Sequence, residues 1–223
     1  METSRRLIAS AADIWKQCEE HPFVRGICDG TLDVGRFRFF LLQDYLYLFE
    51  YARVFAIGVV KSDDLASMRV FGGYIKQILD GEMDIHKSYM KRLGISEDEA
   101  EHVEPALDNL SYTSYMLAVS EAGGEPEIVS SILACAVSYE YIARDIVTDN
   151  PAAADHPFFG EWVRGYACQE YHDANVELCE LMDRQVLDEK RYRKVEEIFV
   201  NCSLYELAFW QMAWDRRMGP ALS

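Results

Sequence analysis

One pattern of hydrophobic residues, with a period near 3.6, runs through most of this 223-residue chain. It is clearest in LLQDYLYLFEYARVF, residues 41–55, where apolar and aromatic side chains recur every three or four positions. We find no convincing segment with the alternating pattern of a half-buried strand, no internal repeat and no low-complexity linker. The sequence therefore predicts an all-α helical bundle formed by a single domain over residues 1–223.

Capping and turn residues divide this pattern into helices. Ser62, Asp63 and Asp64 offer N-caps, Gly94 ends a helix, and Pro22 with two glycines makes residues 21–31 an expected loop. The expected long helices cover about residues 4–20, 33–60, 64–93, 111–122, 127–148, 158–184 and 188–217. Residues 96–105 are expected to form a short acidic helix or turn, and residues 149–157 a loop. Three glycines permit a kink or close packing inside the third helix: Gly72, Gly73 and Gly81.

Charge restricts the partners of the chain. The formal net charge is −16 and the isoelectric point is about 4.7, and the densest basic stretch is only DRRMG near the end. A grip on phosphates needs clustered Lys and Arg, so we expect no nucleic-acid or anionic-membrane partner. No run of about 18 apolar residues predicts a membrane span. The first residues read as an amphipathic helix and not as a signal peptide, so we expect a cytoplasmic protein.

Six cysteines occur without a C-x-x-C pair, and their spacing matches no zinc pattern. A reducing compartment keeps such thiols free, and most of them are expected to be small buried apolar residues. Metal chemistry has little support. Glu99 and His102 have the Glu-x-x-His spacing of di-iron bundles only once, and Glu82 with His86 suits a surface pair as well as a ligand pair. We therefore expect no metal and no cofactor; phosphate-binding and serine-hydrolase motifs are missing from the sequence.

Reactive polar groups stand beside aromatic residues on three of the expected helices. Residues three or four apart share a helix face. Three such pairings occur: Asp44 with Tyr47, Cys135 with Tyr139, and Glu206 with Phe209 and Trp210. A buried carboxyl group needs hydrogen bonds or shifts its pKa, and tyrosine hydroxyls supply such bonds. Two interpretations stay open from spacing alone: a functional pocket, or ordinary amphipathic helices with core aromatics and a structural thiol at Cys135.

The segment HPFVRGICDGTLDVGRFRFFLLQDYLYL, residues 21–48, resembles the N-terminal signature of the TenA family, the thiaminase II proteins. The similarity continues in SYTSYMLAVSEAGG, ILACAVSYEYI, WVRGYACQEY and YELAFWQMAW, and so covers nearly the whole chain in order. This resemblance implies a haem-oxygenase-like helical bundle that assembles as a homotetramer. It also implies a hydrolase in thiamin salvage, acting on thiamin or on derived aminopyrimidines such as 4-amino-5-aminomethyl-2-methylpyrimidine, without metal or haem.

The resemblance also implies roles for particular residues. Cys135 corresponds to the family nucleophile, Glu206 to its acid–base carboxyl group, and Asp44 to the group that binds the pyrimidine amine and ring nitrogen. The expected aromatic lining consists of Tyr47, Tyr112, Tyr139, Tyr166 and Phe209. Because an uncompensated buried carboxylate is costly, removing the charge of Asp44 is expected to leave stability unchanged or to raise it.

Three positions depart from the family pattern, and they bear on substrate preference and on packing around the site: Ala134, Gln211 and Trp214. A non-catalytic or regulatory pyrimidine-binding protein on the same fold is the alternative function. Presence of both Cys135 and Glu206 favours the enzyme, because a binding protein needs neither. A haem or di-iron oxidase fails on the number of ligands.

Overall fold

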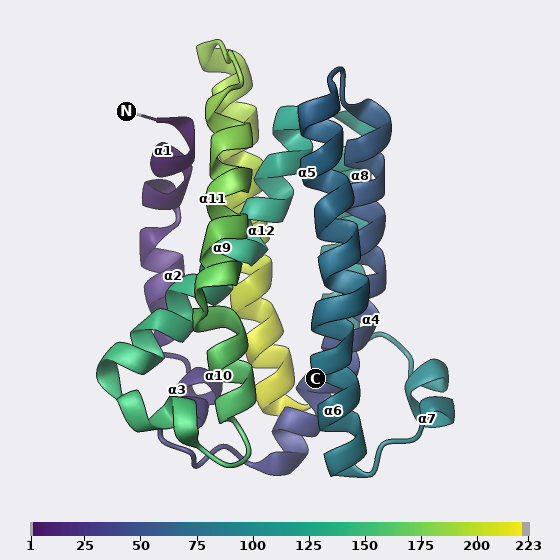
Figure 1. Cartoon of the computed structure of the whole chain (residues 1–223), viewed down its shortest axis with the longest axis vertical. Helices are drawn as coiled ribbons and strands as arrows, with labels where there is room; N and C mark the ends of the chain where they lie inside the picture. The colour runs from purple at the N-terminus through teal and green to yellow at the C-terminus, as the bar shows by residue number, and fades with distance from the viewer. Residues whose placement is uncertain (1, 220–223) are drawn as a thin grey trace.

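The computed structural model describes residues 2–219, apart from the side chain of Glu97; Met1 and residues 220–223 of the predicted domain lie outside the described part. Over residues 2–219 the secondary structure is helical and contains no strand, which confirms the predicted all-α class (Figure 1). The α-helices are α1 (Thr3–Ser10), α2 (Ala12–Glu19), α3 (Pro22–Cys28), α4 (Val34–Lys61), α5 (Leu65–Lys76), α6 (Met83–Leu93), α7 (Glu97–His102), α8 (Leu107–Ala122), α9 (Glu125–Asp149), α10 (Gly160–Ala167), α11 (Gln169–Asp183) and α12 (Glu189–Asp215). None of the described helices combines the length and apolar character that a bilayer crossing requires.

Helices α9 and α12 pack along each other at the centre of the bundle, and α9 also contacts α4, α8, α10 and α11 (Figure 1). Small side chains make this crowding possible. Ser130, Ser131, Ala134, Ala136 and Ser138 of α9 are all at most 2% exposed. Their size lets neighbouring helices approach closely, so α9 is buried on most of its circumference.

Helix α4 confirms the expected long helix over residues 33–60. The side chain of Asp33 caps it by accepting a hydrogen bond from the Arg36 amide nitrogen at 3.0 Å. At the other end, the Lys61 ammonium group donates to the carbonyl oxygens of Ser120 at 2.8 Å and Gly123 at 2.7 Å. These bonds satisfy carbonyl groups at the end of α8 and join the two helices.

The expected helix over residues 64–93 is continuous but changes its winding in the middle. Asp64 caps its start, and Gly94 ends it with a φ of 67°, in the left-handed region. Between α5 and α6 lies a π-helical segment, η1 (Gln77–Glu82), which contains Gly81. The wider turn shifts the phase of the residues that follow, and His86 is consequently buried in α6.

The expected helix over residues 4–20 is wrong in its continuity, because the chain breaks at Ala11 between α1 and α2. The break lets α1 pack against α11 while α2 packs against α12. Asp183 of α11 accepts hydrogen bonds from the Ser4 amide at 2.7 Å and hydroxyl at 2.8 Å, while the Trp15 indole donates to Ser203 of α12 at 3.1 Å. Tertiary contacts therefore override the continuous periodic pattern.

The expected loop over residues 21–31 is also wrong, because it contains α3. Pro22 occupies the first helical position, and the His21 side chain caps the helix by accepting from the Phe23 amide at 3.2 Å. A similar correction applies to residues 158–184, which split into α10 and α11 where Cys168 adopts an extended ψ of 162°. Within the expected loop 149–157, residues Pro151–Asp155 form a 3₁₀ turn, η2.

Gly58 of α4 marks the closest approach between α4 and α5. A Cβ atom there would lie 2.5 Å from Phe71 Cδ1, and Phe71 is fully buried. We therefore expect Gly58→Ala to lower the free energy of unfolding by about 1–3 kcal/mol through overpacking. Gly72→Ala in α5 is the matched control, because its Cβ meets nothing within 4 Å and replaces glycine inside a helix. It should stabilise the protein by roughly 0.5–1 kcal/mol. Urea unfolding of both variants decides this, and equal stability of Gly58→Ala and the parent would contradict the packing.

Candidate functional site

The structure brings together the three polar groups that the sequence analysis selected. Asp44 comes from α4, Cys135 from α9 and Glu206 from α12, and their exposed fractions are 4%, 7% and 2%. The helix periodicity placed each group on an apolar face, and the packing of α4, α9 and α12 turns these faces toward one interior. A thiol and two carboxyl groups therefore share a region that water scarcely reaches.

The Glu206 carboxyl group is hydrogen-bonded to the Tyr112 hydroxyl group and to the Cys135 thiol. The Tyr112 hydroxyl donates to Glu206 Oε1 at 2.7 Å, and the Cys135 thiol donates a second hydrogen bond to the same carboxyl group. Burial raises the pKa of Glu206 to about 8; the two hydrogen bonds oppose this shift, and the charge of Asp44 adds to it. Glu206 can therefore both accept and release a proton near neutral pH.

Cys135 is held as a thiol in the absence of a ligand. Burial, followed by the charge of Glu206, raises its pKa well above the ordinary value, while a hydrogen bond from Tyr47 lowers it. The Tyr47 hydroxyl also lies 3.6 Å from the thioether sulfur of Met116, a weak acceptor. Tyr47 is thus the neighbour, unidentified from sequence, whose hydrogen bond opposes the rise in the pKa of Cys135.

Asp44 has a counter-charge that the sequence analysis missed. Its Oδ2 lies 2.8 Å from His86 Nε2, and His86 Nδ1 lies 2.9 Å from the backbone carbonyl oxygen of Glu82. A carbonyl oxygen only accepts, so Nδ1 must carry a hydrogen. The bond between Nε2 and Oδ2 then contains one further proton, and the pair of side chains is electrically neutral whichever atom holds it.

The pKa of His86 follows from this pairing. Burial alone would lower it, but the hydrogen bond and charge of Asp44 raise it above the usual value. Asp44 is consequently not an uncompensated charge, and the expectation that its neutralisation leaves stability unchanged or higher is withdrawn. Removing one partner of a buried pair is destabilising, because the other charge is left alone. The spacing of Glu82 and His86 suits a surface pair as well as a ligand pair; the surface interpretation is wrong for His86, which is 3% exposed and bonds to Asp44.

Glu82 ends the π-helical segment and is half-buried. Burial, followed by the charge of Asp44, raises its pKa to about 7, and His86 opposes the shift. The signal for this group in the sequence was its position four residues before His86. That spacing alone did not indicate which way the pair faces, because the π-helical segment changes the phase of the helix.

The expected aromatic lining forms two ring clusters in the interior, which are joined through Trp210 and Phe40. Tyr47 lies 5.3 Å from Tyr112 and 6.0 Å from Phe209 between ring centroids, and Tyr139 lies 4.9 Å from Tyr166. Tyr51 stacks on Tyr47 at 5.3 Å, although the sequence analysis had not selected it. Five residues of the expected lining and the three reactive groups therefore lie in the same interior.

Two of the three departures from the family pattern lie beside α3 and away from these groups. Gln211 is exposed; its Oε1 lies 3.2 Å from His21 Nε2, and its Nε2 donates to Asp215. The ring of Trp214 carries the Arg36 guanidinium 3.5 Å above its centroid. Ala134 is fully buried in α9, one residue before Cys135. Only this third departure adjoins the reactive groups.

The residues considered for metal binding are engaged elsewhere. Glu99 forms an ion pair with Arg38, and His102 Nδ1 donates to the Asp98 carbonyl oxygen at 2.7 Å on the short helix α7. Across residues 2–219, no group of three or more His, Cys, Asp and Glu side chains is arranged to hold a metal ion.

Comparisons with known proteins bear on the family and the fold of the chain. The sequence profile of the TENA/THI-4/PQQC family matches residues 8–216. A protein of Halalkalibacterium halodurans named aminopyrimidine aminohydrolase is 42% identical over 220 residues, which cover 98% of each chain. The solved structure of a TenA homologue from P. horikoshii OT3 superposes with a TM-score of 0.88 at 30% identity, over 96% of this chain and 99% of that one. A domain of Shewanella denitrificans described as having a heme oxygenase-like fold superposes with a TM-score of 0.77 at 14% identity, over 95% and 92% of the two chains, which confirms the predicted fold.

The raised pKa values predict how stability depends on pH. Glu82, Glu206 and His86 each bind protons more tightly in the folded state than in the unfolded state. Each carboxyl group stabilises the fold fully below its ordinary pKa, and this contribution is lost as pH rises to the folded pKa, about 7 for Glu82 and about 8 for Glu206. The contribution of His86 is likewise present below its ordinary pKa and is lost as pH rises through the higher folded value. We expect Tm to fall by roughly 5 °C or more between about pH 5.5 and 8.5.

Differential scanning calorimetry across this range measures the slope. Glu206→Gln should flatten it, because the amide does not titrate, whereas Glu197→Gln on the exposed face of α12 should leave it unchanged. A Tm that is constant or rises over this range would contradict the protonation states assigned to the interior.

Proposed function

The chain belongs to the TENA/THI-4/PQQC family, and from this membership we propose that it is an aminopyrimidine aminohydrolase of thiamin salvage. The observation that carries the proposal is the contact between the Cys135 thiol and the Glu206 carboxyl group, in a buried interior lined by tyrosines. A protein that only binds pyrimidines needs no such pair. The proposed substrates are thiamin-derived aminopyrimidines such as 4-amino-5-aminomethyl-2-methylpyrimidine, and cleavage of the C–N bond of thiamin by the same groups is a second proposed activity.

The proposed chemistry begins at the sulfur of Cys135. The aminopyrimidine carbon that carries the amino group is electron-poor, so sulfur adds to it while ionised Glu206 takes the thiol proton. Tyr47 donates its hydrogen bond to sulfur as negative charge develops there. Glu206 then returns the proton to the departing nitrogen, and ammonia leaves as the C–N bond breaks. Water displaces sulfur in the second half, with Glu206 taking a proton from water and restoring the thiol.

Asp44 and the aromatic residues are proposed to hold the ring. Because Asp44 Oδ2 is engaged by His86, Oδ1 is the oxygen left to accept a hydrogen bond from the pyrimidine amine. The neutral Asp44–His86 pair keeps that acceptor fixed without leaving a charge alone in the interior. Tyr139 and Tyr166, with centroids 4.9 Å apart, offer faces for stacking on a flat ring and hydroxyl groups at its edge.

We also propose that residues 1–223 form one TenA-like domain, supported by the family match over residues 8–216. A cytoplasmic location is proposed from the six free cysteines, because reducing compartments maintain free thiols.

Cys135→Ser provides the test of the nucleophile. The variant should retain the parental melt but lose nearly all turnover of the aminopyrimidine, because a hydroxyl group is a far weaker nucleophile at neutral pH. Cys179→Ser, which alters a half-buried thiol outside the reactive group, is the matched control and should keep parental kinetics. Steady-state ammonia release measures turnover of the aminopyrimidine, and release of the thiazole product measures cleavage of thiamin as a second substrate. If Cys135→Ser turns over within a few-fold of the parent, sulfur is not the nucleophile.

A homotetramer is the proposed assembly. A net charge of −16 separates chains unless they share a substantial apolar surface. Apolar side chains project from α4 and α8, where Phe49 is 39% exposed and Leu110 is 48% exposed, and both line a cleft of about 420 Å³ between these helices. Multi-angle light scattering at micromolar concentration should give the mass of four chains. Phe49→Glu with Leu110→Glu should reduce this mass, whereas Val186→Glu, at an exposed position between α11 and α12, should not. A parent of monomer mass would refute the assembly.

A further inference from the structure

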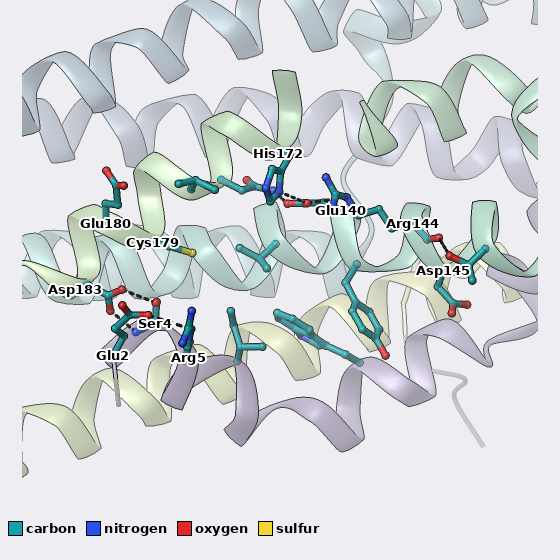
Figure 2. Close-up of a pocket in the computed structure, with 17 residues that line it drawn as sticks. Glu2, Ser4, Arg5, Glu140, Arg144, Asp145, His172, Cys179, Glu180 and Asp183 are labelled. Atoms are coloured by element: carbon teal, nitrogen blue, oxygen red, sulfur yellow. Dashed lines mark hydrogen bonds and ion pairs between the residues drawn. The ribbon is translucent and has the colours of Figure 1, made fainter. Parts of the chain in front are cut away.

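A second cleft, of about 690 Å³, lies between the N-terminal helix α1, the outer side of α9, and α11 (Figure 2). Its volume falls within the range of small-molecule sites. Neither Asp44, Cys135 nor Glu206 lines it. The proposed reaction therefore makes no use of the polar groups gathered there.

A buried amide in the wall of this cleft has an acceptor without a partner. Asn175 of α11 is 3% exposed, and its Nδ2 donates to Glu140 Oε2 at 2.8 Å and to the Ala136 carbonyl oxygen at 3.1 Å. Exchanging the two amide atoms would turn an oxygen toward two acceptors, so this orientation is fixed by its neighbours. The Oδ1 atom is buried and has no hydrogen-bond partner within the described part of the chain. It requires a donor.

The charges of the cleft are unequal. Five carboxyl groups line it, against two guanidinium groups. Both guanidinium groups are already paired: Arg5 Nε lies 3.0 Å from Glu2, and Arg144 Nε lies 2.9 Å from Glu140. The His172 ring nitrogen Nδ1 also approaches Glu140, at 2.6 Å. A cation would therefore meet more unpaired opposite charge in this cleft than an anion would.

Three carboxyl groups remain without a cationic partner among the residues lining the cleft: Asp145, Glu180 and Asp183. Figure 2 shows Asp145 toward one end of the cleft, and Glu180 with Asp183 toward the other. Asp145 Oδ2 is buried with no hydrogen-bond partner. Burial, followed by the charges of Glu19 and Asp149, raises the pKa of Asp145, while the charge of Arg25, which does not line the cleft, opposes the shift. Asp183 accepts only from the uncharged amide and hydroxyl groups of Ser4.

The spacing of these acids sets the length of a suitable ligand. The hydrogen bond between Asn175 and Glu140 places these two residues at the same height along α11 and α9. Glu180 lies five residues after Asn175 on α11. Asp145 lies five residues after Glu140 on α9. At 1.5 Å per residue on antiparallel helices, the two acids are about 15 Å apart along the helix axes. Aliphatic side chains of Ile8, Val137 and Val176 line the cleft as well.

We propose that this cleft binds a linear aliphatic polyamine, with terminal ammonium groups at the acids of the two ends, methylene groups against the aliphatic wall, and an internal amine donating to Asn175 Oδ1. Such a ligand supplies N–H donors and positive charge where the cleft lacks both, and its length matches the separation of the acids. The site is distinct from the proposed reaction, so its occupancy is measured as binding and not as turnover.

Isothermal titration calorimetry of the full chain with spermidine at low ionic strength is the test. Asp145→Asn combined with Glu180→Gln removes one charge from each end without changing side-chain shape, and should weaken spermidine binding by roughly tenfold or more. The control combines Asp63→Asn with Glu197→Gln, which lowers the net charge equally at exposed positions outside the cleft, and should stay within about twofold of the parent.

The internal amine has its own comparison. Spermidine and 1,8-diaminooctane separate their terminal nitrogens by the same number of chain atoms, but only spermidine has a central N–H. The preference for spermidine should shrink in Asn175→Ala, in which Glu140 keeps its bonds from His172 and Arg144. A thermal melt verifies that this variant is folded, and the double charge variant decides the question if it is not. Equal weakening in the cleft and control variants means nonspecific attraction to an acidic protein and overturns the proposal, as does the lack of spermidine binding at millimolar concentration.

Discussion

The fold depends on burying ionisable groups in an aromatic interior without a large loss of hydration free energy. A lone carboxylate there would lose several kcal/mol of hydration. The chain meets this constraint in two ways. Asp44 is neutralised by His86 from α6, 2.8 Å away. Burial raises the pKa of Cys135, which keeps its proton, and raises the pKa of Glu206 to about 8, so this carboxyl group exchanges its proton near neutral pH. Helix α6 must therefore present an imidazole to α4, and the π-helical segment before it gives His86 that direction.

Long helices and reactive groups were predictable from sequence, because their signals are local. Asp33 and Gly94 mark helix ends through backbone geometry, and the period of residues 41–55 places Asp44 on a face with Tyr47. The partner of Asp44 was not predictable in this way. His86 is 42 residues away, and its direction depends on a change of winding that leaves no clear trace in the hydrophobic pattern. The site residues drawn from the family resemblance gather in space because each lies on the apolar face of its helix.

Breaks in the helices were missed for a related reason. Nothing in the residues around Ala11 interrupts a helical period, and the chain bends there because Ser4 bonds to Asp183 of α11 while Trp15 bonds to Ser203 of α12. Helix α3 was overlooked because Pro22 and nearby glycines suggest a loop, although Pro22 stands at the one helical position where its missing N–H costs nothing. In both cases local propensity permits more than one backbone conformation, and contacts with distant residues determine which one forms.

The protonated state of Cys135 has a consequence for the durability of the resting protein. Thiolates attack peroxides and disulfides, whereas a thiol that keeps its proton reacts slowly with both. Burial at 7% exposure and the charge of the adjoining Glu206 keep the sulfur protonated and thus slow its oxidation to a sulfenic acid. In the proposed reaction the thiolate exists only while its proton resides on Glu206, so the environment that spares the sulfur from cellular oxidants also makes the protonated group a poor nucleophile.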